Sequence, residues 1–247
     1  KNYLIMRFKQ SRAVRTFTLP EVKDVVNTIS PDLEAIADYE TNIVNWLSSI
    51  IDLSNFNVYP VNGITEGLNY WMLNEKRKIY MNDNDYVWVP NNKEGDILYM
   101  STPSAIDGNH KTIPDDVPVA LDLAYIGSAD VKKIDIKDNI EVVFFSLSKC
   151  FGLRNIRTGW FFSRKKIPYL HTLIYNAKYY NYYSHKVAEA VIDNFSVDYV
   201  YNKLRPYQIN ICESLNIKPS DVVWLGGEDR VCISKEISAA YDSSFTS

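Results

Sequence analysis

Short apolar runs along the chain predict buried β-strands. Each run is rich in β-branched or aromatic side chains and is too short for a typical helix. The runs cover residues 58–61, 78–81, 96–100, 118–122, 142–145 and 160–162. The run 142–145 is apolar at every position, as expected of a strand that is buried on both faces of a sheet.

Apolar positions with helical spacing predict several helices. One is expected from Leu33 to Ile51, with Ser30 as its cap and Pro31 in its first turn. A second should begin after Gly63. Two long ones are expected over residues 167–195 and 197–215.

The two ends of the chain carry weaker patterns. Residues 1–30 are interpreted as a basic arm or short strand, residues 221–234 as a β-hairpin, and residues 239–247 as a disordered tail.

A lysine follows the most apolar strand. After residues 142–145 the chain continues with Ser146-Leu-Ser-Lys149, then with Phe151-Gly152 and Arg157. Ligands of open parallel sheets bind just outside the carboxyl ends of the strands, so Lys149 is placed for chemistry. A lone lysine in a loop is more often a solvated side chain. The functional interpretation therefore depends on the neighbouring residues.

Composition excludes several classes of partner. The chain has 247 residues and a net charge of −3, which provides no basic field for nucleic acid or anionic lipid. Its apolar runs are far shorter than the roughly 20 residues of a membrane span. The three cysteines and three histidines lack metal-ligand spacing. We expect a soluble, cytoplasmic protein without a bound metal.

The segment around Lys149 resembles the cofactor-lysine segment of aspartate-aminotransferase-like enzymes of fold type I, which depend on pyridoxal 5'-phosphate (PLP). The resemblance rests on the run Ser-x-Ser-Lys-x-Phe-Gly and on Arg157, eight residues after Lys149. It implies that Lys149 forms a Schiff base with PLP, while Ser146, Ser148 and Arg157 hold the phosphate. A desolvated lysine beside cationic groups loses its proton easily, and a guanidinium suits a phosphate.

Asp122 and Tyr125 support this resemblance. Asp122 ends an apolar strand, where an unpaired carboxylate is costly unless a cation meets it. In the family, an Asp-x-x-Tyr element binds the pyridine nitrogen through the aspartate and the ring oxygen through the tyrosine. Without the lysine segment, a strand-end aspartate is more often a cap or turn residue.

The turn Gly63-Ile64-Thr65 resembles the family's first phosphate loop. A turn that directs backbone N–H groups and a helix N-terminus at one point can bind an anion. Strand-turn-helix units with these residue types are also common as plain structure. The resemblance implies that the amides after Gly63 and the Thr65 hydroxyl bind the phosphate.

Three further residues are assigned from weaker matches. Tyr86 is expected to stack on the pyridine ring, with Trp88 as the alternative. The asparagine that usually binds the ring oxygen is replaced by Ala105, and Asn109 is the candidate substitute. Arg230, at the start of a short strand, is expected to bind the substrate carboxylate, although a lone arginine there is usually a surface residue.

The resemblance implies an α/β fold of type I, a mostly parallel, helix-covered sheet. Residues 36–210 are expected to form the large cofactor-binding domain, and residues 1–35 and 211–247 a reduced small domain. The implied function is an aminotransferase that acts on an amino acid and a 2-oxo acid as a homodimer. The alternatives are a decarboxylase, lyase or synthase on the same fold, or a non-catalytic PLP-binding protein.

Overall fold

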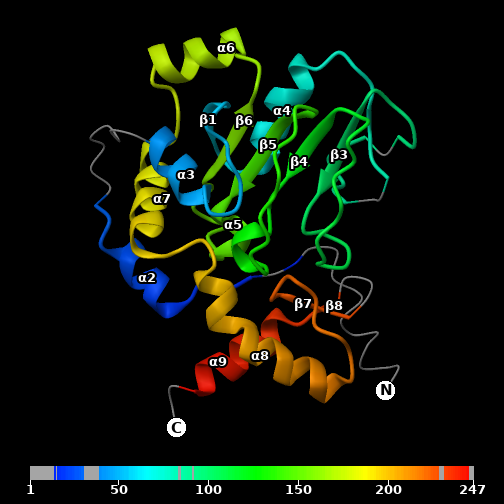
Figure 1. The fold of residues 1–247 in the computed structure, drawn as a ribbon. Coiled ribbons are helices and arrows are strands. Elements are labelled where there is room, and N and C mark those ends of the chain that lie inside the picture. The colour runs from blue at the N-terminus through cyan, green and yellow to red at the C-terminus, as the bar shows by residue number, and fades with distance from the viewer. Residues whose placement is uncertain are drawn as a thin grey trace.

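The computed structural model describes residues 14, 16–30, 39–82, 85–90, 92–227 and 231–244. Its centre is a six-stranded sheet in the order β1-β6-β5-β4-β3-β2 (Figure 1). Strands β2, β3, β4 and β5 pair in parallel, whereas β6 runs antiparallel to both β5 and β1. This is the mostly parallel α/β arrangement that was predicted. The strands are β1 (Asn57–Val61), β2 (Ile79–Tyr80), β3 (Ile97–Ser101), β4 (Val119–Asp122), β5 (Ile140–Ser146) and β6 (Gly159–Ser163).

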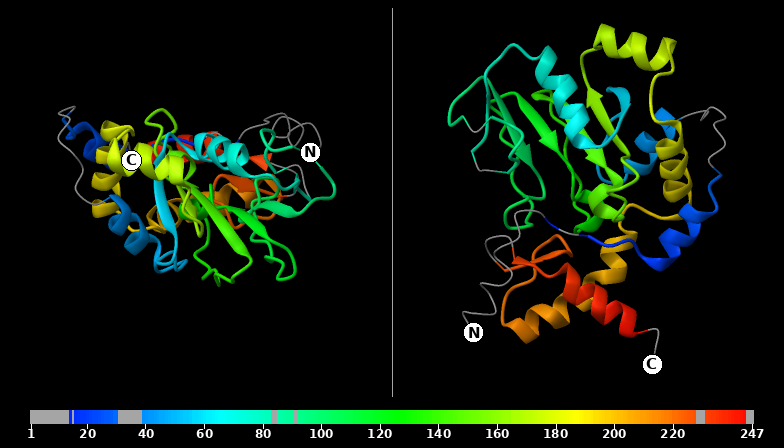
Figure 2. Two further views of the ribbon diagram at one scale, coloured as in Figure 1. Left: turned by 90° about the horizontal axis from the view of Figure 1, so that it is seen from above. Right: turned by 180° about the vertical axis from the view of Figure 1, so that it is seen from behind.

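Helices cover both faces of the sheet because side chains alternate along each strand. On β5, Val142 and Phe144 pack in one apolar cluster with residues of α4 (Ile64–Asn74). Val143 and Phe145 point the other way, into a cluster with residues of α3 (Tyr39–Leu47) and α7 (Tyr182–Asn194). The view from behind in Figure 2 has α4 in front of the strands. The run 142–145 is thus buried on both sides, as its composition predicts.

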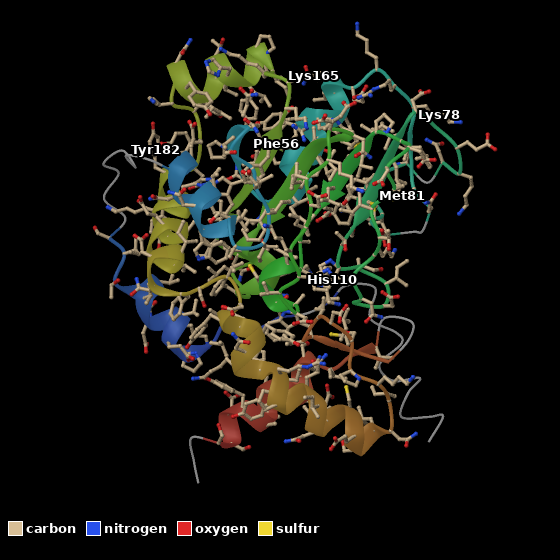
Figure 3. The ribbon with its side chains drawn as sticks, viewed as in Figure 1. Phe56, Lys78, Met81, His110, Lys165 and Tyr182 are labelled. Carbon is tan, nitrogen blue, oxygen red and sulfur yellow. The ribbon has the colours of Figure 1, made fainter. Side chains whose placement is uncertain are left out.

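The C-terminal elements lie beyond the lower end of the sheet in Figure 1. They are α8 (Tyr199–Leu215), β7 (Leu225–Gly226), β8 (Val231–Cys232) and α9 (Ser234–Ser243). Several hydrogen bonds join this part to the segments beside the end of the sheet, and two of them illustrate the contact. The indole Nε1 of Trp224 donates to the Lys149 carbonyl at 2.9 Å, and the backbone N–H of His110, labelled in Figure 3, donates to Asp221 Oδ2 at 2.9 Å. The predicted domain boundary at residue 210 falls inside α8.

The N-terminal segment runs beside the lysine segment before it enters α2 (Pro20–Asn27). Thr16 Oγ1 donates to the Ser148 carbonyl at 3.3 Å, and Thr18 Oγ1 donates to the Gly152 carbonyl at 3.1 Å. These bonds bring a distant part of the chain to the carboxyl end of β5. Val14 and residues 16–19 therefore form a wall beside Lys149, called the N-terminal wall.

Three predictions about secondary structure are wrong. The stretch 167–195 is not one helix, because α6 (Pro168–His171) and the π-helix η2 (Thr172–Asn176) end before Asn181 caps α7. Residues 239–243 belong to α9, in which Tyr241 is buried. Residues 20–27 form a helix, with Val22 buried against the core. The predicted helix start at Pro31 lies outside the described residues.

None of the helices within the described ranges is both long and apolar enough to cross a membrane.

Gly152 should be required for the contact between the N-terminal wall and the lysine segment. Its φ is +71°, and a Cβ there would collide with the Phe17 carbonyl. We expect Gly152→Ala to lower the free energy of unfolding by at least about 2 kcal/mol, measured by urea denaturation. Gly227→Ala is a matched control, since Gly227 has the same φ of +71° but its Cβ would meet nothing closer than 3.4 Å. Equal losses in the two variants would show that the Phe17 contact contributes nothing.

Candidate active site

The carboxyl ends of β3, β4 and β5 border a cavity of about 370 Å³. The start of α4, the N-terminal wall and β8 complete its lining. Most of the residues singled out in the sequence come together here. Those that line the cavity are Ile64, Thr65, Tyr86, Asp122, Tyr125, Ser146, Ser148, Lys149 and Arg157. Their chemical roles remain predictions.

Lys149 projects into this cavity from α5 (Leu147–Cys150), the short helix that follows β5 directly. Its Nζ donates to the Val14 carbonyl of the N-terminal wall at 2.8 Å. Burial lowers the pKa of the amine, and the charge of Arg154 acts in the same direction, whereas Cys232 and Asp122 oppose it. The neutral, nucleophilic form of Lys149 is therefore more accessible than that of a surface lysine.

Asp122 ends β4 and is 4% exposed. Its Oδ1 accepts from the Ala124 backbone N–H at 2.8 Å, and its Oδ2 accepts from the Tyr99 hydroxyl. Burial raises the pKa of the carboxyl to about 6, and these hydrogen bonds only partly offset that effect. A cation that entered the cavity beside Asp122 would stabilise the carboxylate.

The turn before α4 forms an anion-binding geometry. Gly63, with φ +85°, lets the Arg157 guanidinium lie against the backbone, where Nη2 donates to the Asn62 carbonyl at 2.8 Å. A Cβ on Gly63 would meet that Nη2 at 2.5 Å. The first N–H groups of α4 lack partners within the helix, so the helix end and the guanidinium together favour an anion. Ser146 and Ser148 of the lysine segment line the same cavity.

Ser148 contributes a buried hydroxyl without a protein partner. It lines the cavity at 8% exposure, and its Oγ makes no hydrogen bond to the residues that the structure describes. A buried polar atom of this kind is usually satisfied by a ligand or by water. Its position beside the Gly63 turn and Arg157 fits a phosphate.

Tyr86 lines the cavity and is fixed by its hydroxyl, which lies 2.6 Å from Thr65 Oγ1. Trp88, the alternative ring-stacking residue, also lines the cavity but is 65% exposed. The better-buried and better-anchored side chain is therefore the one that was preferred from the sequence.

Among the predicted residues, Asn109 is not part of the described lining of the cavity, and the prediction for Arg230 is not tested. Asn109 accepts from the Asp221 backbone N–H through Oδ1 at 3.3 Å, and the cavity lining drawn from the described residues includes Ala105 but not Asn109. Its side chain thus supports the docking of the C-terminal part. Arg230 lies outside the described residues.

Several residues of the site could not be predicted from the sequence. Asp85, 7% exposed, accepts from the Ser101 backbone N–H at 3.1 Å and pairs with Lys111 at 3.3 Å. Tyr99 reaches Asp122 because β3 and β4 are parallel neighbours with Ser101 opposite Asp122. Only the register of the sheet reveals that contact. Arg154 and Cys232 also line the cavity.

Replacing Asp122 by asparagine should stabilise the protein at neutral pH when no ligand is added. The folded-state pKa of about 6 lies above the usual 3.8, so the buried carboxylate disfavours folding fully above pH 6 and less as the pH falls toward 4. Asparagine can still accept from Ala124 and donate to Tyr99. We expect a gain of roughly 2 to 3 kcal/mol at pH 7.5 that fades by pH 4, measured by urea unfolding.

Asp115→Asn provides the control, because this carboxyl is exposed and its ion pair with Lys137 is worth little. It should show no comparable gain. A loss of stability in Asp122→Asn at every pH would contradict the electrostatic account of this site.

Comparison with known proteins identifies the fold. No protein-family model and no curated protein sequence matches the chain. Solved structures do. L-threonine-O-3-phosphate decarboxylase from Porphyromonas gingivalis is 14% identical with a TM-score of 0.62, covering 86% of this chain and 83% of that chain.

Two further neighbours have other activities. The PLP-bound C-S lyase from Staphylococcus hominis is 13% identical with a TM-score of 0.63, covering 87% of this chain and 75% of that chain. An aminotransferase from Neisseria meningitidis is 12% identical with a TM-score of 0.62, covering 95% and 90%. At such identities the likeness shows the fold alone. The chain has the fold of the PLP-dependent enzymes of fold type I.

Proposed function

We propose that the chain binds PLP in this cavity and transfers an amino group between an amino acid and a 2-oxo acid. The observation that carries the proposal is that Lys149 and Asp122 line the same cavity with pKa values moved in opposite directions by burial. A neutral amine and a carboxylate that lacks a cation are the two groups that a pyridoxal ring and its aldehyde need.

The residues fit PLP from end to end. The Gly63 turn, Thr65, Arg157 and the two serines Ser146 and Ser148 would hold the phosphate. Asp122 would face the ring nitrogen, Tyr125 the ring oxygen, and Tyr86 the ring itself. When bound, PLP supplies an electron sink for the carbanion that forms at the α-carbon of the substrate.

The protein's own groups would then bind, orient and move protons. Lys149 Nζ would hold the cofactor through its aldehyde, and as a neutral amine it would accept the α-proton of the substrate. Asp122 would pair with the protonated ring nitrogen. Tyr99 and the Ala124 N–H hold the carboxylate in place for that contact. The apolar wall of the cavity limits access of water to Lys149.

The structural neighbours support the cofactor more strongly than the reaction. They include an aminotransferase, a decarboxylase and a C-S lyase on the same fold. PLP chemistry is shared among these classes, and the protein selects the bond that breaks. We further propose a homodimer in the cytoplasm with a reduced small domain, built from residues 1–35 and 211–247. Light scattering of the purified protein tests the dimer.

Lys149 should be the residue that carries the cofactor. Incubation with PLP and reduction with borohydride should add one pyridoxyl phosphate group, which peptide mass mapping places on Lys149. Lys149→Ala should lose the label. Lys165→Ala, an exposed lysine at the opposite end of the sheet (Figure 3), should keep it. A label on another lysine, or none, would remove the basis of the proposed function.

The reaction itself is tested with a panel of amino donors and 2-oxo acid acceptors. We expect a new amino acid and a new oxo acid in equal amounts, followed by chromatography, with a Lys149→Ala control that produces neither. Release of carbon dioxide, or of ammonia with a thiol, in place of these products would assign the chain to another PLP reaction.

A further inference from the structure

Arg154 is a cation of the cavity without a protein partner. It lines the cavity together with Lys149 and Arg157. Its side chain makes no hydrogen bond or ion pair with the part of the chain that the structure describes. Its carbonyl, in contrast, accepts from Arg157 Nη1 at 3.1 Å, which fixes the backbone from which the guanidinium projects.

The two arginines differ in what they contact. Arg157 donates to the Asn62 and Arg154 carbonyls, at 2.8 Å and 3.1 Å, and lies against the Gly63 turn. The Arg157 guanidinium is therefore held at the anion-binding turn. Within the described residues the Arg154 side chain has no acceptor, so its five N–H donors are available to a ligand.

Charge in the cavity indicates where such a ligand would lie. Arg154 and Lys149 line the same cavity, and the charge of Arg154 lowers the pKa of Lys149. The carboxylates of the lining cannot compensate it, because Asp85 pairs with Lys111 and Asp122 bonds Tyr99. An anion bound at Arg154 would offset the repulsion between the two cations.

We propose that Arg154 binds a carboxylate of the substrate whose amino group reacts at Lys149. This rests on the proposed function of the cavity and adds the residue that recognises the carboxylate of the amino acid. A guanidinium matches a carboxylate with two parallel hydrogen bonds, which gives orientation as well as affinity. The carboxylate is either the α-carboxylate or one on the side chain.

Binding of succinate tests the proposal without turnover, because succinate carries carboxylates but no amine. Calorimetry on the PLP-loaded protein should give a Kd that is about 10- to 100-fold higher for Arg154→Ala than for wild type. Arg154→Lys should recover part of the affinity, since a point charge cannot form the two-bond pair. Lys165→Ala, which removes a positive charge far from the cavity (Figure 3), should bind as wild type does.

The kcat/KM values of alanine, glutamate and ethylamine identify the carboxylate. If Arg154 binds the α-carboxylate, Arg154→Ala should lose about 10- to 100-fold on alanine and glutamate but not on ethylamine. If it binds a side-chain carboxylate, only glutamate should suffer. Either pattern supports the proposal.

Unchanged succinate binding in Arg154→Ala, or an equal loss on all three amines, would overturn it. Arg154→Ala should still take the borohydride label on Lys149. A wild-type protein that takes no label would instead refute the proposed function, so the two failures are distinguishable.

Discussion

Burial of a carboxylate and an amine in one cavity is the constraint on which this structure depends. Asp122 is almost fully removed from water and receives one side-chain and one backbone hydrogen bond, so its ionised form is disfavoured. Lys149 is disfavoured as a cation for the same reason. Such groups do not stabilise a fold, because the free-energy cost of removing their charges from water exceeds the free energy gained from two hydrogen bonds. A ligand that contacts both groups would offset this cost, as the proposed function requires.

The sheet brings the two groups together, and this part of the site followed from the sequence. Asp122 and Ser146 end neighbouring parallel strands, and an apolar run that stops at a polar residue marks a strand end reliably. The turn at Gly63 was also predicted, from its resemblance to the family's phosphate loop, and the structure adds that a Cβ there would meet Arg157. These features are formed by residues that are close together in the sequence, so they can be predicted from it.

The contacts that surround these groups depend on register and on distant segments, which local patterns do not record. From the sequence, Tyr99 is an ordinary aromatic residue of the core. Its hydrogen bond to Asp122 is seen only when β3 pairs with β4. The N-terminal wall has the sequence of a surface arm, and only the fold shows that Val14 accepts from the Lys149 amine and that Thr16 donates to the Ser148 carbonyl. Asn109 was assigned to the cavity from a motif, but its side chain is used by the C-terminal part. Arg154 sits inside the most recognisable motif and was overlooked because only its neighbours match the family.

We propose above all that PLP lies in this cavity with its ring between Lys149 and Asp122. A crystal structure of the protein grown with PLP measures it directly. We predict a covalent bond from the cofactor to Lys149 Nζ, the phosphate within hydrogen-bond distance of Thr65 and Arg157, and the ring nitrogen facing Asp122. A cofactor bound at another lysine, or one in this cavity with Asp122 facing no cofactor atom, would contradict it.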